Sequence, residues 1–215
     1  MVIFMSYRSI SPSVIRRLPR YYRFLEDLKA SGITRISSSE LSKKMGLTAS
    51  QIRQDLNCFG GFGQQGYGYN AELLSNEIAK ILGLDKPQKL IIIGIGNLGK
   101  AIATHIRFDN KGYELIGLFD KKEAIIGQVV HNLPIRSMDS LDEFCKENHP
   151  TAAVLCIPKE SAEAISYKLV KLGIKGFLNF SHYDLGLAYP DVSVENVHFG
   201  DKLMVLSYKM HNNKT

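Results

Sequence analysis

The glycine-rich motif Gly94-Ile-Gly-Asn-Leu-Gly99 carries the clearest chemical signal in this sequence of 215 residues. It follows the apolar run from Leu90 to Ile93 and opens an apolar helical stretch, and Asp120 stands about 20 residues further on. In this context the first glycine permits a tight turn, the second lets the backbone approach a pyrophosphate, and the third lets helix and strand pack closely. The motif therefore predicts a dinucleotide site at the start of a helix.

Asp120 indicates which dinucleotide would bind. A carboxylate at the end of the second strand accepts hydrogen bonds from the adenosine ribose and repels a 2′-phosphate, which favours NADH and NAD+ over NADPH and NADP+. Lys121 and Lys122 weaken this preference, because cations there would neutralise the phosphate. Domains that bind CoA share the glycine turn and form an alternative, against which Asp120 argues.

A second group of side chains has the chemistry for reading DNA bases. Ser50, Arg53, Gln54 and Asn57 are spaced so that they share one face of a helix, with apolar residues on the opposite face. Arg pairs bidentately with guanine, and Gln or Asn pairs with adenine, in the major groove. A solvated helix face is the alternative interpretation of this stripe alone.

The location of charge favours the DNA interpretation. The net charge is +6, and all of the excess positive charge lies in residues 1–60. A basic block beside a neutral remainder predicts a polyanionic partner, for which nucleic acid is the first candidate and an anionic membrane surface the rival.

Short helices and a hairpin are expected to position the DNA-reading stripe. The segments 37–40 and 48–51 both have the form of a capping box, so two helices start close together, as in a helix-turn-helix. The glycine- and aromatic-rich segment 59–69 predicts a β-hairpin, which would be a wing. A helix before them is expected to bury the stripe Ile15, Leu18, Tyr22, Leu25 and Leu28.

The second half of the chain alternates strands and helices. Strands are expected at 90–93, 115–120, 153–157 and 176–180, which predicts a doubly wound parallel sheet. The predicted fold class is α/β, with an N-terminal winged-helix domain followed by a Rossmann-type sheet and a C-terminal helix. The expected domains are 1–84 for DNA binding, 85–199 for NAD(H) binding, and 200–215 for the C-terminal helix and tail.

Several classes of protein are excluded by what the sequence lacks. The six histidines and three cysteines show no metal-like spacing, so no metal is expected. No run approaches the length of a membrane span and no secretory signal is present, so the protein is expected to work in the cytoplasm without a membrane partner. The sheet leaves no room for a substrate domain, so we expect no enzyme; an NAD-dependent oxidoreductase with an accessory DNA-binding domain is the alternative.

These motifs together resemble one family. The segment Thr48-Ala-Ser-Gln-Ile-Arg-Gln-Asp-Leu56, the wing segment, the glycine motif, Phe119-Asp120, Asn179-Phe180 and Val194-Glu-Asn-Val197 are similar to the redox-sensing repressors called Rex. The resemblance spans nearly the whole chain. It implies a homodimeric repressor that binds double-stranded operator DNA and is released by NADH, with a C-terminal helix at about 200–211 swapped onto the partner subunit.

The resemblance also implies a set of switch residues, at which this chain departs from the family. His105 stands where the family often has Tyr, and His198 where it often has Asp; that Asp is expected to pair with an Arg that matches Arg23 here. Phe199, which the family brings to the nicotinamide pocket of the partner, is retained. At the wing tip, Gln64 and Gln65 replace the usual basic residues.

The expected site residues fall into two sets. The cofactor set is Gly94, Ile95, Gly96, Asn97, Leu98, Gly99, Asp120, Ile157, Pro158, Asn179, Phe180 and Phe199. The DNA set is Lys43, Lys44, Ser50, Gln51, Arg53, Gln54, Asn57, Gln64 and Gln65.

Overall fold

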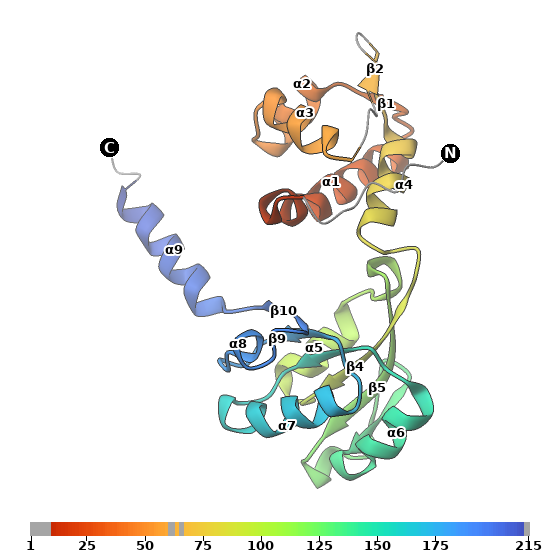
Figure 1. Cartoon of the computed structure of the whole chain (residues 1–215), viewed down its shortest axis with the longest axis vertical. Coiled ribbons are helices and arrows are strands. Elements are labelled where there is room, and N and C mark those ends of the chain that lie inside the picture. Colours follow the sequence, from red (N-terminus) through yellow and green to blue (C-terminus); the bar gives the residue numbers. More distant parts are fainter. Residues whose placement is uncertain (1–9, 60–62, 65–66, 213–215) are drawn as a thin grey trace. The chain divides into compact units, whose positions relative to one another are not determined.

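The structure, a computed structural model, describes residues 10–59, 63–64 and 67–212. The chain forms two compact units, which meet in sequence between Asp85 and Lys86 (Figure 1). Each unit has its own apolar core.

The N-terminal unit is a winged helix, as the sequence predicts. Its elements are α1 (Pro12–Ala30), β1 (Arg35–Ile36), α2 (Ser38–Met45), α3 (Ala49–Asn57), β2 (Gly63–Gln64), β3 (Gly68–Asn70) and α4 (Ala71–Ile81). The strands pair antiparallel in the order β1-β3-β2. Strands β2 and β3, which come after α3 in the chain and pair antiparallel, take the place of the predicted wing.

The starts of α2 and α3 are fixed by local hydrogen bonds. The Ser37 side chain accepts from the backbone N–H of Glu40 at 3.1 Å, and the Glu40 carboxylate accepts from the backbone N–H of Ser37 at 2.8 Å, so the predicted capping box is confirmed. Gly46 ends α2 in the left-handed region, and the Thr48 hydroxyl caps α3. The two helices are therefore separated by a short, well-defined turn.

The buried face of α1 differs from the predicted one. Leu18, Leu25 and Leu28 are buried as expected, but Ile15 is 39% exposed, and Tyr21 rather than Tyr22 is fully buried. The predicted and the observed buried faces both include the three leucines, so the spacing of apolar residues does not decide whether Tyr21 or Tyr22 is buried. Tyr21 belongs inside because its hydroxyl donates to a buried acceptor on α3, described below.

The C-terminal unit is a seven-stranded Rossmann-type sheet. Its principal elements are β4 (Gln88–Ile93), α5 (Asn97–His105), β5 (Tyr113–Asp120), β6 (Val129–Val130), β7 (Leu133–Ser137), α6 (Leu141–Asn148), β8 (Ala152–Leu155), α7 (Lys159–Lys171), β9 (Gly176–Asn179), α8 (Leu185–Ala188), β10 (Ser193–Asn196) and α9 (Phe199–Asn212). Short 3-10 turns lie at Asp109–Lys111, Glu123–Ile125 and Met138–Ser140. The sequence patterns do not predict β6, β7, β10 or α8.

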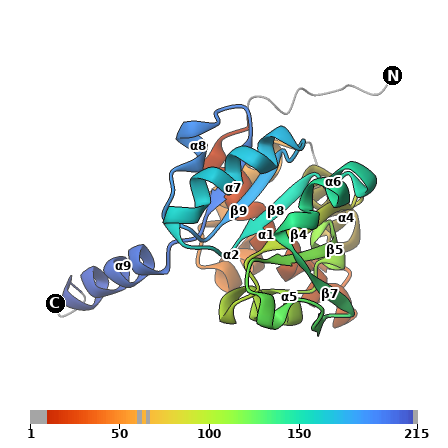
Figure 2. The same ribbon diagram turned by 90° about the horizontal axis from the view of Figure 1, so that it is seen from below.

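The strand order creates a switch point beside β4. The order is β10-β9-β8-β4-β5-β7-β6, with all neighbours parallel except β6 and β7. The chain leaves β4 for β5 on one side and later returns to β8 on the other. Helices α6 and α7 cover one face of the sheet and α5 covers the other (Figure 2). Ligands in such sheets bind beyond the carboxyl ends of the strands at this point.

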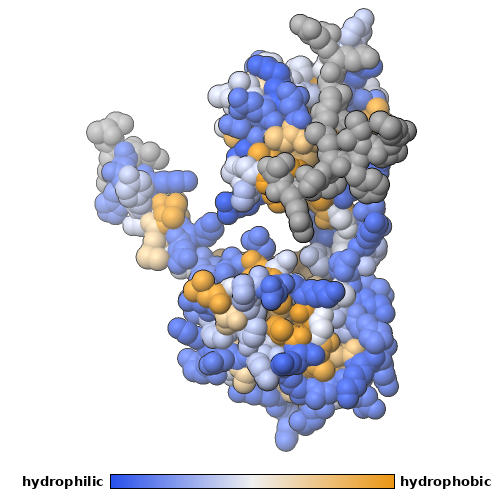
Figure 3. Space-filling view, viewed as in Figure 1, coloured by the Kyte–Doolittle hydropathy of each residue, from blue (hydrophilic) through white to orange (hydrophobic). Residues whose placement is uncertain are grey.

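The last helix, α9, has no buried residue in the part of the chain that the structure describes. Its large apolar side chains are at least half exposed, and several of them form an apolar patch in the space-filling view (Figure 3). They are Phe199, Leu203, Met204, Val205, Leu206, Tyr208 and Met210. No helix in the described part of the chain is long and apolar enough to cross a membrane.

Gly99 should be indispensable for the stability of the C-terminal unit. A Cβ at this position would lie 1.9 Å from the carbonyl oxygen of Gly94, which is backbone and cannot move aside cheaply. We expect Gly99→Ala to lower the free energy of unfolding by about 1 to 3 kcal/mol, measured by thermal or denaturant unfolding. Gly96→Ala is the matched control, because a Cβ there meets nothing within 4 Å. Equal stability of the two variants would contradict this packing.

Candidate functional site

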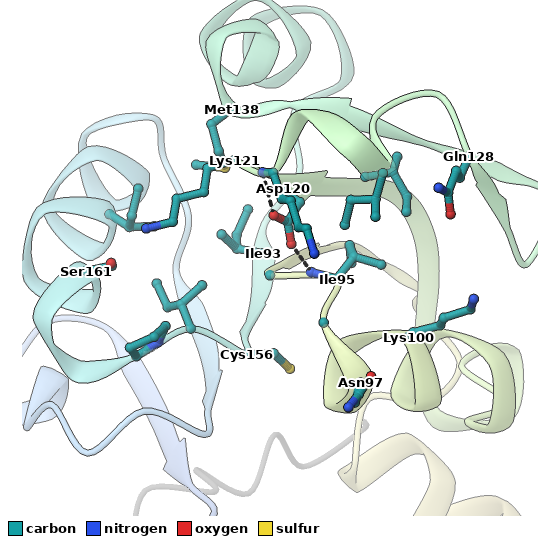
Figure 4. Close-up of a pocket in the computed structure, with 18 of the residues that line it drawn as sticks. Ile93, Ile95, Asn97, Lys100, Asp120, Lys121, Gln128, Met138, Cys156 and Ser161 are labelled. Atoms are coloured by element: carbon teal, nitrogen blue, oxygen red, sulfur yellow. Dashed lines mark hydrogen bonds between the residues drawn. The ribbon is translucent and has the colours of Figure 1, made fainter.

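A cavity of about 790 Å³ opens at the switch point of the sheet. It lies beyond the carboxyl ends of β4 and β5 and is lined by the glycine loop, Asp120, and residues that follow β8. Figure 4 shows Asp120 above the loop, with Asn97 and Lys100 of α5 on one side and Ser161 of α7 on the other. The volume is in the range of pockets that hold cofactors.

The glycine loop presents bare backbone to this cavity. Gly94 has φ +90°, and a Cβ there would lie 2.5 Å from the carbonyl oxygen of Cys156, so the turn requires glycine. Gly96 is exposed and has open space where a side chain would be. The N-terminus of α5 has no side-chain cap, which leaves its first N–H groups for a ligand. These are the features that bind a pyrophosphate.

Asp120 is held in a fixed position beside the loop. Its carboxylate accepts from the backbone N–H of Ile95 at 2.6 Å and from that of Lys122 at 2.8 Å (Figure 4). It is half-buried, whereas Lys121 and Lys122 are exposed at the same edge of the cavity. A fixed carboxylate in this place suits ribose hydroxyls as donors.

The opposite wall of the cavity is mainly apolar. Ile157 and Pro158 line it, as the sequence analysis expected, together with Cys156 and Ile165. Burial raises the pKa of the Cys156 thiol to about 12, so this side chain is a neutral packing group rather than a nucleophile. Leu98 is 39% exposed and does not line the cavity.

Asn179 acts as a buried structural group in this chain. Its side-chain oxygen accepts from the backbone N–H and hydroxyl of Ser181, and its amide donates to Tyr183 and Asn196. It therefore ties β9 to the following loop and to the end of β10. Neither Asn179 nor Phe180 lines the cavity.

The switch candidates lie in different units. His198 packs its ring 5.0 Å from that of His182, its Nδ1 lies 3.9 Å from Asp201, and its Nε2 is buried without a partner among the described residues. Phe199 follows at the start of α9 and lies 6.1 Å from the ring of Phe180. His105 is exposed at the end of α5.

Arg23 belongs to the N-terminal unit, where it is exposed on α1. The family resemblance implies that an Arg at this position pairs with an Asp, which is His198 in this chain. That the family's Asp–Arg pair does not form here stays a prediction.

The DNA stripe lies on the exposed face of α3. Ser50, Arg53, Gln54 and Asn57 are all exposed, whereas Ile52 and Leu56 are buried. The Arg53 guanidinium donates to the hydroxyl of Ser38 at 3.1 Å, which holds it near the start of α2.

The remaining residues of the DNA set have varied surroundings. Lys43 and Lys44 are exposed in the last turn of α2, and the Lys44 ammonium lies 5.2 Å from the ring centre of Phe24. Gln64 lies in β2, with a side chain outside the described atoms, and Gln65 lies outside the described residues.

Gln51 differs from the rest of the DNA set because it points toward a buried network. Its amide donates to Asp55 at 2.9 Å, and Asp55 also binds the Arg17 guanidinium and the Tyr21 hydroxyl. Burial raises the pKa of Asp55, but the hydrogen bonds from Arg17, Gln51 and Tyr21 outweigh burial and keep that pKa below its ordinary value. Apolar spacing does not predict this network; its one signal in the sequence is an Asp on the apolar face of a helix.

The described residues contain no group of three or more His, Cys, Asp or Glu side chains placed to hold a metal ion.

Comparisons with known proteins agree with this geometry. Residues 9–57 match the family described as putative DNA-binding protein N-terminus, and residues 85–183 match the CoA binding domain family. The redox-sensing transcriptional repressor Rex of Caldanaerobacter subterraneus subsp. tengcongensis is 52% identical, over 94% of this chain and 90% of that protein.

Solved structures of a Rex-family repressor, RSP, are similar over the whole fold. The crystal structure of RSP in complex with beta-NAD+ and operator DNA has a TM-score of 0.88 and 49% identity, covering 95% of this chain and 94% of that one. The structure of RSP in complex with beta-NADH has a TM-score of 0.86 and 46% identity, covering 96% of both chains. The chain therefore belongs to the Rex family of redox-sensing transcriptional repressors.

Proposed function

We propose that this chain is a homodimeric transcriptional repressor that binds operator DNA and leaves it when NADH binds. The observation that carries the proposal is the presence, in one chain, of a dinucleotide cavity and an exposed base-reading stripe. RSP, its structural relative, is known in complex with NAD+ and operator DNA and in complex with NADH. We place this activity in the cytoplasm.

The DNA-binding role rests on how α3 divides its residues. Buried Ile52 and Leu56 anchor the helix, and the exposed stripe of Ser50, Arg53, Gln54 and Asn57 is left for base edges. Lys43 and Lys44, at the end of α2, would contact phosphates, which position the protein without reading sequence. We leave Gln51 out of the base-reading set because its amide binds Asp55.

The cofactor role rests on the loop and on Asp120. The uncapped start of α5 would hold the pyrophosphate, and Asp120 would accept from the ribose hydroxyls. CoA is the less suitable ligand, because a fixed carboxylate at the end of β5 would repel a 3′-phosphate on the ribose. The same repulsion disfavours NADPH.

The switch must work through a difference in affinity between two states. A ligand shifts an equilibrium only by binding one state more tightly, so NADH must prefer the dimer that cannot hold DNA. Val197 and His198 join β10 to α9, which begins at Phe199. We expect a change at the nicotinamide end of the cofactor to reach α9 at this junction. With His at 198, the Arg23 pair of the family cannot form as an Asp–Arg ion pair.

A mobility-shift assay tests the proposed function directly. The full chain is bound to an AT-rich palindromic duplex, and NAD+, NADH or NADPH is added separately. We expect the complex to persist with NAD+ and to dissociate with NADH, with NADPH much less effective. Turnover of NADH with small carbonyl compounds, without release of DNA, would instead favour the oxidoreductase alternative.

Arg53→Ala should weaken operator binding by about 1 to 3 kcal/mol and relax the preference at one base pair, because a bidentate contact to guanine is lost. Lys43→Ala is the comparison: it should weaken all duplexes alike and reduce the slope of affinity against salt. Both are measured by fluorescence anisotropy titrations at several salt concentrations. Unchanged base preference in a folded Arg53→Ala protein would remove α3 from the reading role.

Asp120→Ala should narrow the gap between NADH and NADPH affinities. The variant loses both an acceptor for the ribose and a charge that repels the 2′-phosphate. It also frees the N–H of Ile95, so affinity for both cofactors is expected to fall. The ratio of the two dissociation constants, from NAD(P)H fluorescence titrations, isolates the charge effect. If the unmodified chain already binds NADPH as tightly as NADH, Asp120 does not select the cofactor, and Lys121 or Lys122 is the better candidate for the residue that contacts the 2′-phosphate.

A further inference from the structure

The buried carboxylate of Asp55 is the most densely hydrogen-bonded side chain of the N-terminal unit among the described residues. It is 1% exposed and lies on the inner face of α3. Arg17 of α1 donates to it from Nε at 2.6 Å and from Nη2 at 2.7 Å, Tyr21 donates at 2.9 Å, and Gln51 donates at 2.9 Å. A carboxylate can accept about four hydrogen bonds, so these four donors fill the acceptor capacity of Asp55.

Stability alone is a weak explanation for this network. The Asp55 carboxylate is removed from water and the Arg17 guanidinium partly so, which is costly, and well-packed apolar side chains in place of such a pair are often equally or more stabilising. Ile52 and Leu56 already anchor α3 in an apolar core. The network therefore needs another explanation, and its directionality supplies one.

Apolar contacts and the Asp55 network constrain α3 in different ways. Contacts such as those of Ile52 and Leu56 are non-directional, so they hold α3 against the core but tolerate small rotations about its axis. A planar guanidinium paired with a carboxylate through two bonds tolerates little rotation. Asp55 stands two residues after Arg53 and two before Asn57, so a rotation of α3 that moves Asp55 also moves the stripe.

We propose that Asp55 is a positioning residue for base reading: Arg17 and Tyr21 fix the rotation of α3 on α1 through it, and thereby set the discrimination between bases. This inference rests on the proposed function, in which α3 reads the operator. The network is nearly neutral in charge, so it contributes to the choice among sequences and not to the general attraction of DNA.

The double variant R17M/D55L tests this separation. It removes one positive and one negative charge, so net charge is conserved and the slope of affinity against salt should not change. The full chain first selects an operator from random duplexes. Each base pair of this operator is then substituted in turn. The pair read by Arg53 is the one whose substitution weakens binding of the parent but leaves the affinity of the Arg53→Ala variant unchanged. Discrimination is the ratio of affinities for this operator and for its variant at that pair.

We expect R17M/D55L to unfold at a temperature close to that of the parent and to bind non-operator DNA equally well. Its discrimination at the pair read by Arg53 should fall about tenfold, which is within the range that one bidentate contact supplies. A stable double variant that discriminates as well as the parent would overturn the inference. If Arg53→Ala itself changes no base preference, the proposed function fails at α3, and the two failures are thereby distinguished.

A conservative variant keeps the test decisive if the double variant does not fold. Arg17→Lys retains the charge but replaces the planar fork by a single ammonium, which cannot make two parallel bonds. We expect discrimination to fall several-fold while the salt slope and non-operator binding stay unchanged. Arg16→Lys, on the exposed side of α1, is the matched control and should leave all three quantities unaltered. Equal discrimination in Arg17→Lys and the parent would also overturn the inference.

Discussion

The end of β4 and the first turn of α5 approach so closely that no side chain fits between them. A methyl group at Gly99 would meet the carbonyl oxygen of Gly94, and one at Gly94 would meet the carbonyl oxygen of Cys156. This backbone contact places the start of α5 at the switch point of the sheet, with its N–H groups uncapped. It also brings the N–H of Ile95 to Asp120. The proposed anion site and the proposed ribose acceptor therefore both depend on this one close contact between backbone segments.

The two units fix their geometry by opposite means. In the C-terminal unit the close packing depends on positions without a side chain, and the groups proposed to hold the pyrophosphate are backbone donors. In the N-terminal unit, α3, the helix proposed to read bases, is held through a fully hydrogen-bonded charge, Asp55, at its inner face. Both arrangements resist small displacements, and packed elements of this kind tend to move as rigid bodies. A signal carried from cofactor to DNA would then consist of a change in how whole units are placed.

Local chemistry explains which parts of this structure the sequence could predict. The capping box at Ser37 and the glycine motif each have a residue pattern that a single backbone geometry requires. The β6–β7 hairpin was missed because its turn uses His131 and Asn132 at positive φ, in place of the usual Asn-Gly.

Other features depend on partners that are distant in sequence. Tyr21, rather than Tyr22, is buried because of Asp55, which stands 34 residues away. Apolar periodicity contains no information about such a hydrogen bond. The sequence predicts some lining residues of the cavity, such as Ile157 and Pro158. It does not predict the structural role of Asn179, which depends on tertiary contacts with Tyr183 and Asn196.

The exposed helix α9 has a consequence for how the protein responds to its own abundance. A helix of 14 residues is marginal in water by itself, and the apolar side chains of α9 are left exposed by the described residues of its own chain. In the proposed dimer, the order of α9 and the association of subunits would be a single equilibrium. Stability would then rise with protomer concentration. A fall in protomer concentration, as when a growing cell dilutes the protein, would lower the fraction of chains that are folded and dimeric, and with it the occupancy of DNA. The repressor would then respond to its own concentration in addition to NADH.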